Sequence, residues 1–313
     1  MRRLRSFEVL NLKFPKFRGE LKYFACMKDY TSFKIGGFAD LIAYPLDQED
    51  LLVLLDEIKQ KRLNFFILGN GTNLLVRDGG YQGVLISLKH LNKIRIFEES
   101  KSINNESSIL SVEAGANLSK LLSFALDNNL AGCEFIVGIP GTLGGAICLN
   151  AGIPSNTIGD IVKSVTFLTP YNKFITLSNY EMKFKYRSAI IPKEHIVYEV
   201  KIELKKSNKR KIRSEIKNLI NIRMKKQPYK FATAGSVFKN PPNKSAGELI
   251  ESAGLKGKKI GGAQISAKHA NFIINRGGAK ANDVIKLIEL AKKKVYNLYD
   301  IELETEIVII GEE

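Results

Sequence analysis

Residues 138 to 152 read GIPGTLGGAICLNAG, a glycine-dense segment without a charged side chain. It lies in the uncharged run from Phe135 to Ile153, which is nearly long enough to span a bilayer. Pro140 and the following Pro154 would break a helix there, and the freed backbone groups would stay unpaired in lipid. We therefore interpret the run as a buried loop system that faces a ligand, and we expect no membrane association.

A second glycine loop, GNGTNLL at 69 to 75, follows an apolar segment at 64 to 68 that is typical of a buried strand. Its close glycines let the backbone approach a ligand, and Thr72 and Asn73 can bind phosphate oxygens. Leu74 replaces the third glycine of a dinucleotide fingerprint, and the end of a Walker A loop is missing. Alone, this loop is more typical of a tight turn. Two such loops on separate units indicate one extended, pyrophosphate-linked ligand between them.

Composition favours a folded protein of two or three domains, since 313 residues are 44% hydrophobic and 26% charged. The net charge of +16 has two interpretations. It is either a consequence of a lysine-rich composition or a feature that attracts anionic ligands, nucleic acid included. The three cysteines form no C-x-x-C pair and the three histidines are scattered, so we expect no metal site and a reducing cytoplasm. The basic start lacks the apolar core of a signal peptide.

Hydrophobic periodicity predicts strands and helices in mixed order, which leaves α+β and mixed α/β classes open. Predicted helices cover 47–61, 117–129, 205–226, 246–253 and 282–299, and predicted strands cover 64–68, 83–88, 108–115, 161–168, 173–177, 195–204, 271–275 and 301–310.

The basic run 205–226 is interpreted as a solvated helix that joins domains, with a packed stripe of apolar residues. The stripe consists of Ile212, Ile216, Leu219, Ile220 and Ile222.

Three isolated polar residues are weak candidates on spacing alone. Ser236 lies in ATAGSVFKNP at 232 to 241, and without glycines at 234 and 238 it does not fit a nucleophile elbow. A turn serine and a proton donor both remain open. Arg187, in FKYRS, can bind a carboxylate bidentately, but a lone arginine in a loop is more typical of a surface. Glu306 shares a face of the predicted last strand with Glu304.

Taken together, these motifs resemble the UDP-N-acetylenolpyruvoylglucosamine reductase (UDP-N-acetylmuramate dehydrogenase) family. The resemblance runs from TSFKIGGFADLIAYP at 31 to 45, through GNGTNLLV, GIPGTLGGAICLNAG, YRS, AGSVFKNP and GLKGKKIGGAQISAKHANFIIN, to LETEIVIIG at 303 to 311. The absence of an extra insertion near the end looks like the shorter, second type of this family.

The resemblance implies an α+β protein, with a two-part FAD-binding module of the vanillyl-alcohol-oxidase type and a C-terminal α+β substrate domain. The implied domains are 1–95 and 96–222 for FAD and 223–313 for substrate, with a last strand that can pack back on the FAD module. NADPH would supply hydride and leave, and the chain would be a cytoplasmic monomer that binds no nucleic acid. The implied FAD contacts are Gly69, Asn70, Gly71, Thr72, Asn73, Leu74, Gly138, Ile139, Pro140, Gly141, Thr142, Gly144, Gly145 and Ala146.

The resemblance also implies the chemistry, which is reduction of an enolpyruvyl ether on a UDP-sugar in peptidoglycan precursor synthesis. Hydride would add to C3, Arg187 and Glu306 would bracket the charge on C2 and its carboxylate, and Ser236 would protonate C2. Lys226, Asn240 and Tyr186 would contact substrate. Another FAD oxidoreductase of the same fold is the alternative.

The chain departs from the family pattern in two places. The second glycine loop continues as NAGIPSNTIGD, where the family usually has NAGAYG, so the loop is expected to pack differently. Val308 stands where the family tends to have an arginine, so substrate affinity is in question more than mechanism.

Overall fold

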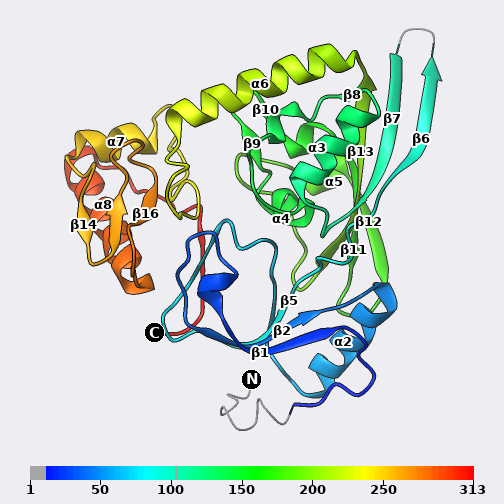
Figure 1. Ribbon diagram of the computed structural model, residues 1–313, viewed down its shortest axis with the longest axis horizontal. Coiled ribbons are helices and arrows are strands. Elements are labelled where there is room, and N and C mark those ends of the chain that lie inside the picture. Colours follow the sequence, from blue (N-terminus) through cyan, green and yellow to red (C-terminus); the bar gives the residue numbers. More distant parts are fainter. Residues whose placement is uncertain (1–11, 103–104) are drawn as a thin grey trace.

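The computed structural model describes residues 12–102 and 105–313, which form three units around a common centre (Figure 1). Part of the basic N-terminal stretch, which we expect not to be a signal peptide, lies outside the described residues. No helix in the described part is long and apolar enough to cross a membrane.

The first unit is a sheet in the order β1-β2-β5-β3 with one helix. Strands β2, β5 and β3 are parallel, and β1 is antiparallel to β2. The helix α2 begins where the side chain of Asp47 accepts the N–H of Asp50 at 2.9 Å, and it buries Leu51, Leu54 and Ile58. The elements are β1 (Glu20–Cys26), β2 (Phe38–Tyr44), α2 (Gln48–Gln60), β3 (Phe65–Ile67), β4 (Leu74–Val76) and β5 (Tyr81–Ile86).

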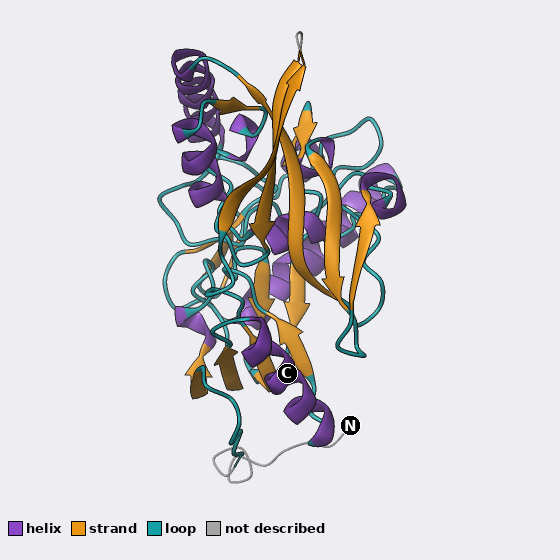
Figure 2. Cartoon of the chain, turned by 90° about the vertical axis from the view of Figure 1, so that its right-hand side faces the viewer, coloured by secondary structure: helices purple, strands orange, loops and turns teal. Residues whose placement is uncertain are grey.

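The second unit is an antiparallel sheet in the order β12-β11-β13-β7-β6, with β8 also paired to β13. Its long strands dominate the side view in Figure 2. The glycine-rich segment 138–152 is not a loop throughout, because it contains the short helix α4. The elements are β6 (Ile94–Ser102), β7 (Asn105–Glu113), α3 (Leu118–Asp127), β8 (Leu130–Ala131), α4 (Leu143–Cys148), β9 (Gly152–Ile153), β10 (Asn156–Thr157), β11 (Val162–Leu168), β12 (Phe174–Ser178), α5 (Asn179–Met182) and β13 (Ile196–Lys206).

The basic helix α6 (Lys209–Lys226) leads from the second unit to the C-terminal unit (Figure 1). It starts four residues later than predicted, because Lys205 and Lys206 complete β13. Its packed side consists of Ile212, which is buried, with Ile216 and Leu219 against the same core. The predicted stripe is too wide, because Ile220 and Ile222 are exposed.

The C-terminal unit packs two helices against the small antiparallel sheet β14-β15-β16. Its core also takes in Phe33, Ile35 and Leu75 of the first unit, which couples the two units. The last strand β17 pairs in parallel with β4, so the chain ends on the first unit. The elements are α7 (Ala246–Ser252), β14 (Lys259–Ile260), β15 (Ala263–Ile265), β16 (Ile273–Asn275), α8 (Ala281–Tyr299) and β17 (Val308–Ile310).

The prediction of one strand over 301–310 is wrong for most of its length. Residues 301–307 follow an irregular path in which Thr305 makes an isolated bridge to Phe238. The segment 301–310 first contacts the stretch that carries Ser236 and then pairs with β4. Because no single neighbouring strand runs along its whole length, it does not form one continuous strand. The carboxylates of Glu304 and Glu306 pair with different cations, Lys239 and Arg187.

Candidate active site

Ser236 lies on an extended segment that is held on both sides. The carbonyl of Asn271 accepts the N–H of Val237 at 2.8 Å on one side, and the carbonyl of Val237 accepts the N–H of Glu306 at 2.8 Å on the other. Gly235 precedes the serine with φ of +85°, a conformation that favours glycine. Ser236 is half-buried, and among the described residues its hydroxyl has no hydrogen-bond partner. The hydroxyl is therefore positioned by its backbone and available to a ligand.

Arg187 occupies the tip of a tight turn from the second unit. The turn is closed by two bonds between Lys185 and Ser188, with the N–H of each donating to the carbonyl of the other at 2.9 and 3.1 Å. Arg187 itself has φ of +51°, which is uncommon for a residue other than glycine and is found at functional sites. Its Nη2 donates to the carbonyl of Gly152 at 3.3 Å. The turn thus aims a guanidinium toward the C-terminal unit.

The carboxylate of Glu306 receives that guanidinium. Nε of Arg187 lies 3.0 Å from Oε1, and the two side chains are 20% and 15% exposed. The pair is close in distance, but Nε is a buried atom without a well-aligned hydrogen bond. Arg187 therefore keeps donor capacity for a further anionic group beside Glu306.

Burial raises the pKa of Glu306, and the charges of Arg187 and, more weakly, Lys239 oppose that rise. The net direction is upward, because withdrawal of the carboxylate from water outweighs its one close ion pair. A carboxyl group tuned in this way is common at active sites, although structural ion pairs show it as well.

A buried asparagine supports the arginine turn from behind. The Nδ2 of Asn150 donates to the carbonyl of Lys185 at 3.0 Å, and its Oδ1 accepts the N–H of Gly159 at 2.9 Å. Asn150 is 4% exposed and follows α4, so it ties the glycine-rich segment to Arg187. This residue was not among the sequence candidates.

The three residues predicted to contact substrate are not equally placed. The N–H of Asn240 donates to the hydroxyl of Tyr186 at 3.2 Å, so these two meet across the units. The side-chain oxygen of Asn240 is used by the N–H of Ala246 at 3.0 Å, which leaves its NH₂ group for a ligand. Lys226 is an exposed residue at the end of α6 and has no described contact with the other two.

The two glycine loops face each other. Oγ1 of Thr72 donates to the carbonyl of Pro140 at 3.0 Å, and Nδ2 of Asn70 donates to Oδ1 of Asn117 at 2.6 Å. A Cβ added at Gly69 would lie 3.0 Å from Oγ1 of Thr142, and one at Gly141 would lie 3.4 Å from Oγ1 of Thr72. These glycine faces are thus bordered by threonine hydroxyls, which suits phosphate oxygens. The residues present fit a pyrophosphate-linked cofactor.

Not every predicted cofactor residue presents its side chain to that space. Leu74 begins β4 and its side chain is buried in the core, and Ala146 lies on the buried side of α4. Asn73 turns its amide to the carbonyl of Glu306 at 3.0 Å. The first glycine loop therefore also braces the carboxylate residue of the candidate site.

Arg223 is a further candidate, which lies outside the sequence motifs. Its Nη2 donates to the carbonyl of Phe135 at 3.3 Å, its Nε is buried without a partner, and burial lowers its pKa. Its Cδ lies 3.3 Å from the position of a Cβ at Gly138. The signal was present, because Arg223 continues the 3–4 spacing of the packed stripe on α6 with a charged residue.

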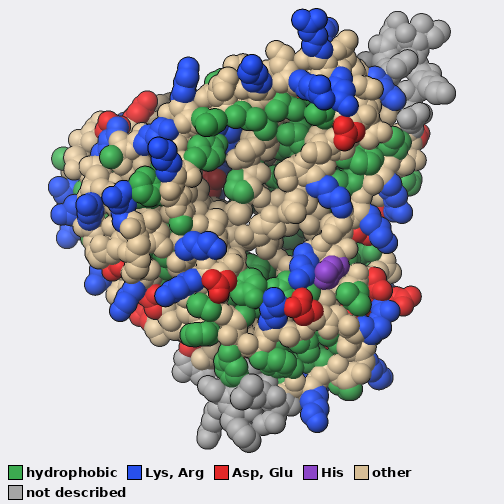
Figure 3. Space-filling model, in the orientation of Figure 1, with side chains coloured by type: hydrophobic (Ala, Val, Ile, Leu, Met, Phe, Trp, Pro, Cys, Tyr) green, Lys and Arg blue, Asp and Glu red, His purple; other side chains and the backbone are tan. Residues whose placement is uncertain are grey.

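Figure 3 shows the face of the molecule hollowed where the units meet, with lysine and arginine side chains around the hollow.

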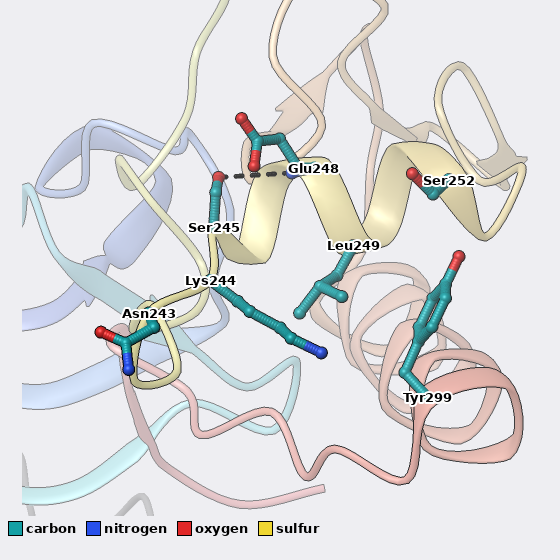
Figure 4. Close-up of a pocket in the computed structure, with 7 residues that line it drawn as sticks. All are labelled: Asn243, Lys244, Ser245, Glu248, Leu249, Ser252 and Tyr299. Atoms are coloured by element: carbon teal, nitrogen blue, oxygen red, sulfur yellow. Dashed lines mark hydrogen bonds between the residues drawn. The ribbon is translucent and has the colours of Figure 1, made fainter.

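A separate groove of about 240 Å³ lies in the C-terminal unit (Figure 4). It contains none of the predicted site residues. The close-up shows Lys244, just before α7, and Tyr299, at the end of α8, with their side chains directed into the groove. In the described part of the chain, no cluster of three or more His, Cys, Asp or Glu residues is arranged to hold a metal. The groove is lined by Asn243, Lys244, Ser245, Glu248, Leu249, Ser252 and Tyr299.

Two family models match this chain. Residues 39–178 match an FAD binding domain, and residues 227–310 match the UDP-N-acetylenolpyruvoylglucosamine reductase C-terminal domain. The two matches cover the glycine loops and the serine segment respectively. They confirm the predicted fold class, an FAD-binding module followed by a C-terminal α+β domain.

Known proteins match over almost the full length. The chain is 47% identical over 287 residues to the UDP-N-acetylenolpyruvoylglucosamine reductase of Caldanaerobacter subterraneus subsp. tengcongensis, covering 91% of this chain and 92% of the relative. It is 41% identical over 295 residues to that of Clostridium novyi, covering 94% and 93%. The crystal structure of the Thermus caldophilus enzyme superposes with a TM-score of 0.76 at 32% identity, covering 93% and 98%. Sequence, domain content and three-dimensional similarity agree, and the chain belongs to the UDP-N-acetylenolpyruvoylglucosamine reductase family.

Proposed function

We propose that this protein is an NADPH-dependent FAD enzyme that reduces the enolpyruvyl ether of UDP-N-acetylglucosamine-enolpyruvate to UDP-N-acetylmuramate, in peptidoglycan precursor synthesis. The observation that carries the proposal is the convergence of Ser236, Arg187 and Glu306 beside the first glycine loop. These residues come from three distant parts of the chain. The side chain of Arg187 pairs with that of Glu306, the N–H of Glu306 donates to the carbonyl of Val237, which follows Ser236, and the carbonyl of Glu306 accepts from Asn73 of the first glycine loop.

The loops at 69–74 and 138–146 would hold FAD, with backbone groups and the hydroxyls of Thr72 and Thr142 at its pyrophosphate. When bound, FAD supplies to the substrate the hydride that NADPH provides, and NADPH becomes NADP⁺. The match of residues 39–178 to an FAD binding domain supports this assignment.

Reduction of the double bond needs a hydride at C3 and a proton at C2. Hydride addition breaks the C2–C3 π bond and moves its electron pair onto C2 and the attached carboxylate. Arg187 would bind that carboxylate, and its guanidinium, which is only partly used by Glu306 and Gly152, supports this role. Glu306 in turn orients Arg187 through their close side-chain contact.

Ser236 would give the proton to C2 and recover one from solvent. A serine hydroxyl is a weak acid in water, but the substrate carbanion is a strong base, so proton transfer is downhill. The hydroxyl is half-buried and has no described protein partner, which leaves it free to donate to a substrate.

Arg223, Lys226, Tyr186 and Asn240 would contact the UDP-sugar. Arg223 suits the role best, because its buried Nε lacks a partner and its guanidinium can bind phosphate bidentately. We expect three domains at 1–95, 96–222 and 223–313 and a monomer in the cytoplasm. The net positive charge of the protein would attract its anionic ligands, FAD, NADPH and the UDP-sugar, and we expect the protein not to bind nucleic acid.

The direct experiment is spectroscopic. The purified protein is incubated with FAD, freed of excess, and reduced anaerobically with NADPH, and the enolpyruvyl UDP-sugar is then added. The proposal expects a yellow holoenzyme that NADPH bleaches and the substrate restores. A protein that takes up no FAD, or whose bleached form does not respond to the substrate, would contradict it.

A further inference from the structure

One buried side chain, that of Asn271, holds the segment that carries Ser236. Its Oδ1 accepts the N–H of Phe238 at 2.9 Å, and its Nδ2 donates to the carbonyl of Phe238 at 2.8 Å. Its backbone carbonyl accepts the N–H of Val237 at 2.8 Å. Asn271 is 4% exposed, so these bonds form away from water. All three bonds fall within two residues of Ser236.

The serine segment needs such support because its strand pairing is minimal. Its pairing with other segments consists of isolated bridges from Ala232 to Asn275, from Ser236 to Phe272 and from Phe238 to Thr305, and none of them extends into a ladder. Gly235 adds freedom at the start of the segment, with φ of +85° and open space around its Cβ position. The amide of Asn271 replaces the pair of bonds that a neighbouring strand would give.

Asn271 is itself held in place. Its backbone N–H donates to Nδ1 of His269 at 3.2 Å, and the ring of His269 packs edge-on against Phe272 at 4.9 Å between centroids. Burial lowers the pKa of His269, which keeps Nδ1 free to accept this bond near neutral pH. The backbone of Asn271 is therefore held in place, and this fixes the position of its side-chain amide.

We propose that Asn271 is a positioning residue that sets the direction of the Ser236 hydroxyl through the backbone of Val237 and Phe238. The proposal rests on the proposed function, in which Ser236 is the proton donor. Both ends of the amide are needed. A carboxylate at this position would keep the acceptor for the Phe238 N–H but turn a charged oxygen toward the Phe238 carbonyl.

The test compares Asn271→Asp with a matched control in the FAD-loaded protein. The control is Asn128→Asp, because Nδ2 of Asn128 also donates to a backbone carbonyl, that of Phe124 at 2.8 Å, at the end of α3. Anaerobic stopped-flow follows flavin reduction by NADPH and flavin reoxidation by the enolpyruvyl substrate separately. We expect Asn271→Asp to slow reoxidation about tenfold or more and to leave reduction unchanged. The control should change neither.

A double variant separates positioning from general damage. If Asn271 acts through Ser236, then Asn271→Asp should slow reoxidation by less than about twofold once Ser236 is alanine. An equal slowing in both backgrounds would overturn the proposal. Asn271→Ser, whose shorter side chain loses both amide bonds without adding a charge, should also slow reoxidation and serves if the aspartate variant does not fold.

Hydrogen exchange gives a readout that needs no cofactor. The amides of residues 232–241 should exchange faster in Asn271→Asp than in the unaltered chain, while those of α2 and α8 should not change. Unaltered exchange in 232–241 would overturn the proposal directly. If the unaltered holoenzyme is not reoxidised by the enolpyruvyl substrate, the proposed function fails, and the exchange result still decides whether Asn271 holds the segment.

Discussion

Nε of Arg187 lies 3.0 Å from Oε1 of Glu306, and this contact joins the turn of the second unit to the irregular segment before the last strand. Both side chains are largely withdrawn from water, so loss of either partner would leave a charge without compensation. The ion pair exists only when the units are docked. The candidate site is therefore a product of assembly of the units and not of any one of them.

We predict that Glu306→Gln alters the dependence of stability on pH in a defined direction. The pKa of Glu306 is raised in the folded state, so folded protein binds its proton more tightly than unfolded protein does. The stability that this group contributes is full below the unfolded pKa, near 4.5, and is lost as pH rises through the folded pKa. Urea unfolding should be measured from pH 4 upward. The free energy of unfolding of the unaltered protein, relative to that of Glu306→Gln, should decrease as pH rises from about 4.5 through the folded pKa.

Glu304→Gln is the control for this experiment. Glu304 is 70% exposed and pairs with Lys239 at the surface, so its removal should change stability by less than about 1 kcal/mol. A stability difference for Glu306→Gln that grows with pH would show that Arg187 outweighs burial, and the assigned direction would be wrong.

Ser236→Ala should separate the two halves of the reaction. Flavin reduction by NADPH should keep its rate, because the serine has no part in it, whereas reoxidation by the enolpyruvyl substrate should slow by roughly 10²–10⁴. Stopped-flow absorbance of the flavin measures both rates. Ser252→Ala, an exposed serine of the C-terminal groove, is the control and should behave like the unaltered protein. Normal reoxidation in Ser236→Ala would remove serine as proton donor.

The sequence predicted the parts of this protein that depend on local pattern. The helix at 47–61 was recognisable from its acidic start and its apolar spacing, and it is observed at Gln48–Gln60. The glycine loops were recognisable because glycine is costly where it has no role. The family resemblance, not spacing, brought Arg187, Glu306 and Ser236 together.

Long-range contacts were beyond local pattern. Residues 301–307 alternate like a strand, yet they make one isolated bridge, from Thr305 to Phe238, and only Val308–Ile310 pair with β4. Asn150 looks like an ordinary loop residue and Asn271 like the first residue of a predicted strand, and their roles depend on the distant carbonyls of Lys185 and Phe238. Arg223 was the exception, since a charge within an apolar stripe was visible in the sequence.

Asn150→Ala should weaken both the fold and the arginine turn. It leaves the carbonyl of Lys185 and the N–H of Gly159 without their partner at a buried site, which costs about 1–3 kcal/mol. We also expect kcat/KM to fall, because the turn that aims Arg187 loses its support. Urea unfolding and steady-state assays measure the two effects.

Asn179→Ala is the matched control for Asn150. Nδ2 of Asn179 donates to the carbonyls of Gly159 and Val162 at 2.7 and 2.8 Å, but it bonds to no residue of the arginine turn. It should lose stability without a matching loss of kcat/KM. If both variants lose activity only in proportion to stability, Asn150 has no specific link to Arg187.

Asp78 fastens the C-terminal unit to the first unit by capping a helix from outside. Its two carboxylate oxygens accept the N–H groups of Ala281 and Asn282 at 2.9 and 3.1 Å, at the first turn of α8. An acceptor at a helix N-terminus is worth about 0.5–2 kcal/mol, and its negative charge also suits the helix dipole. Asp78→Ala should therefore lower the free energy of unfolding by about that amount.

The adjacent ion pair supplies the comparison for Asp78. Arg77 pairs with Glu313, whose side chain is 89% exposed, so Glu313→Gln should cost less than about 1 kcal/mol. Because Asp78 acts between units, its loss should also speed amide exchange at the start of α8 more than elsewhere in the C-terminal unit. Equal effects of the two variants on unfolding, with no change in exchange at 281–285, would show that the cap does not fasten the units.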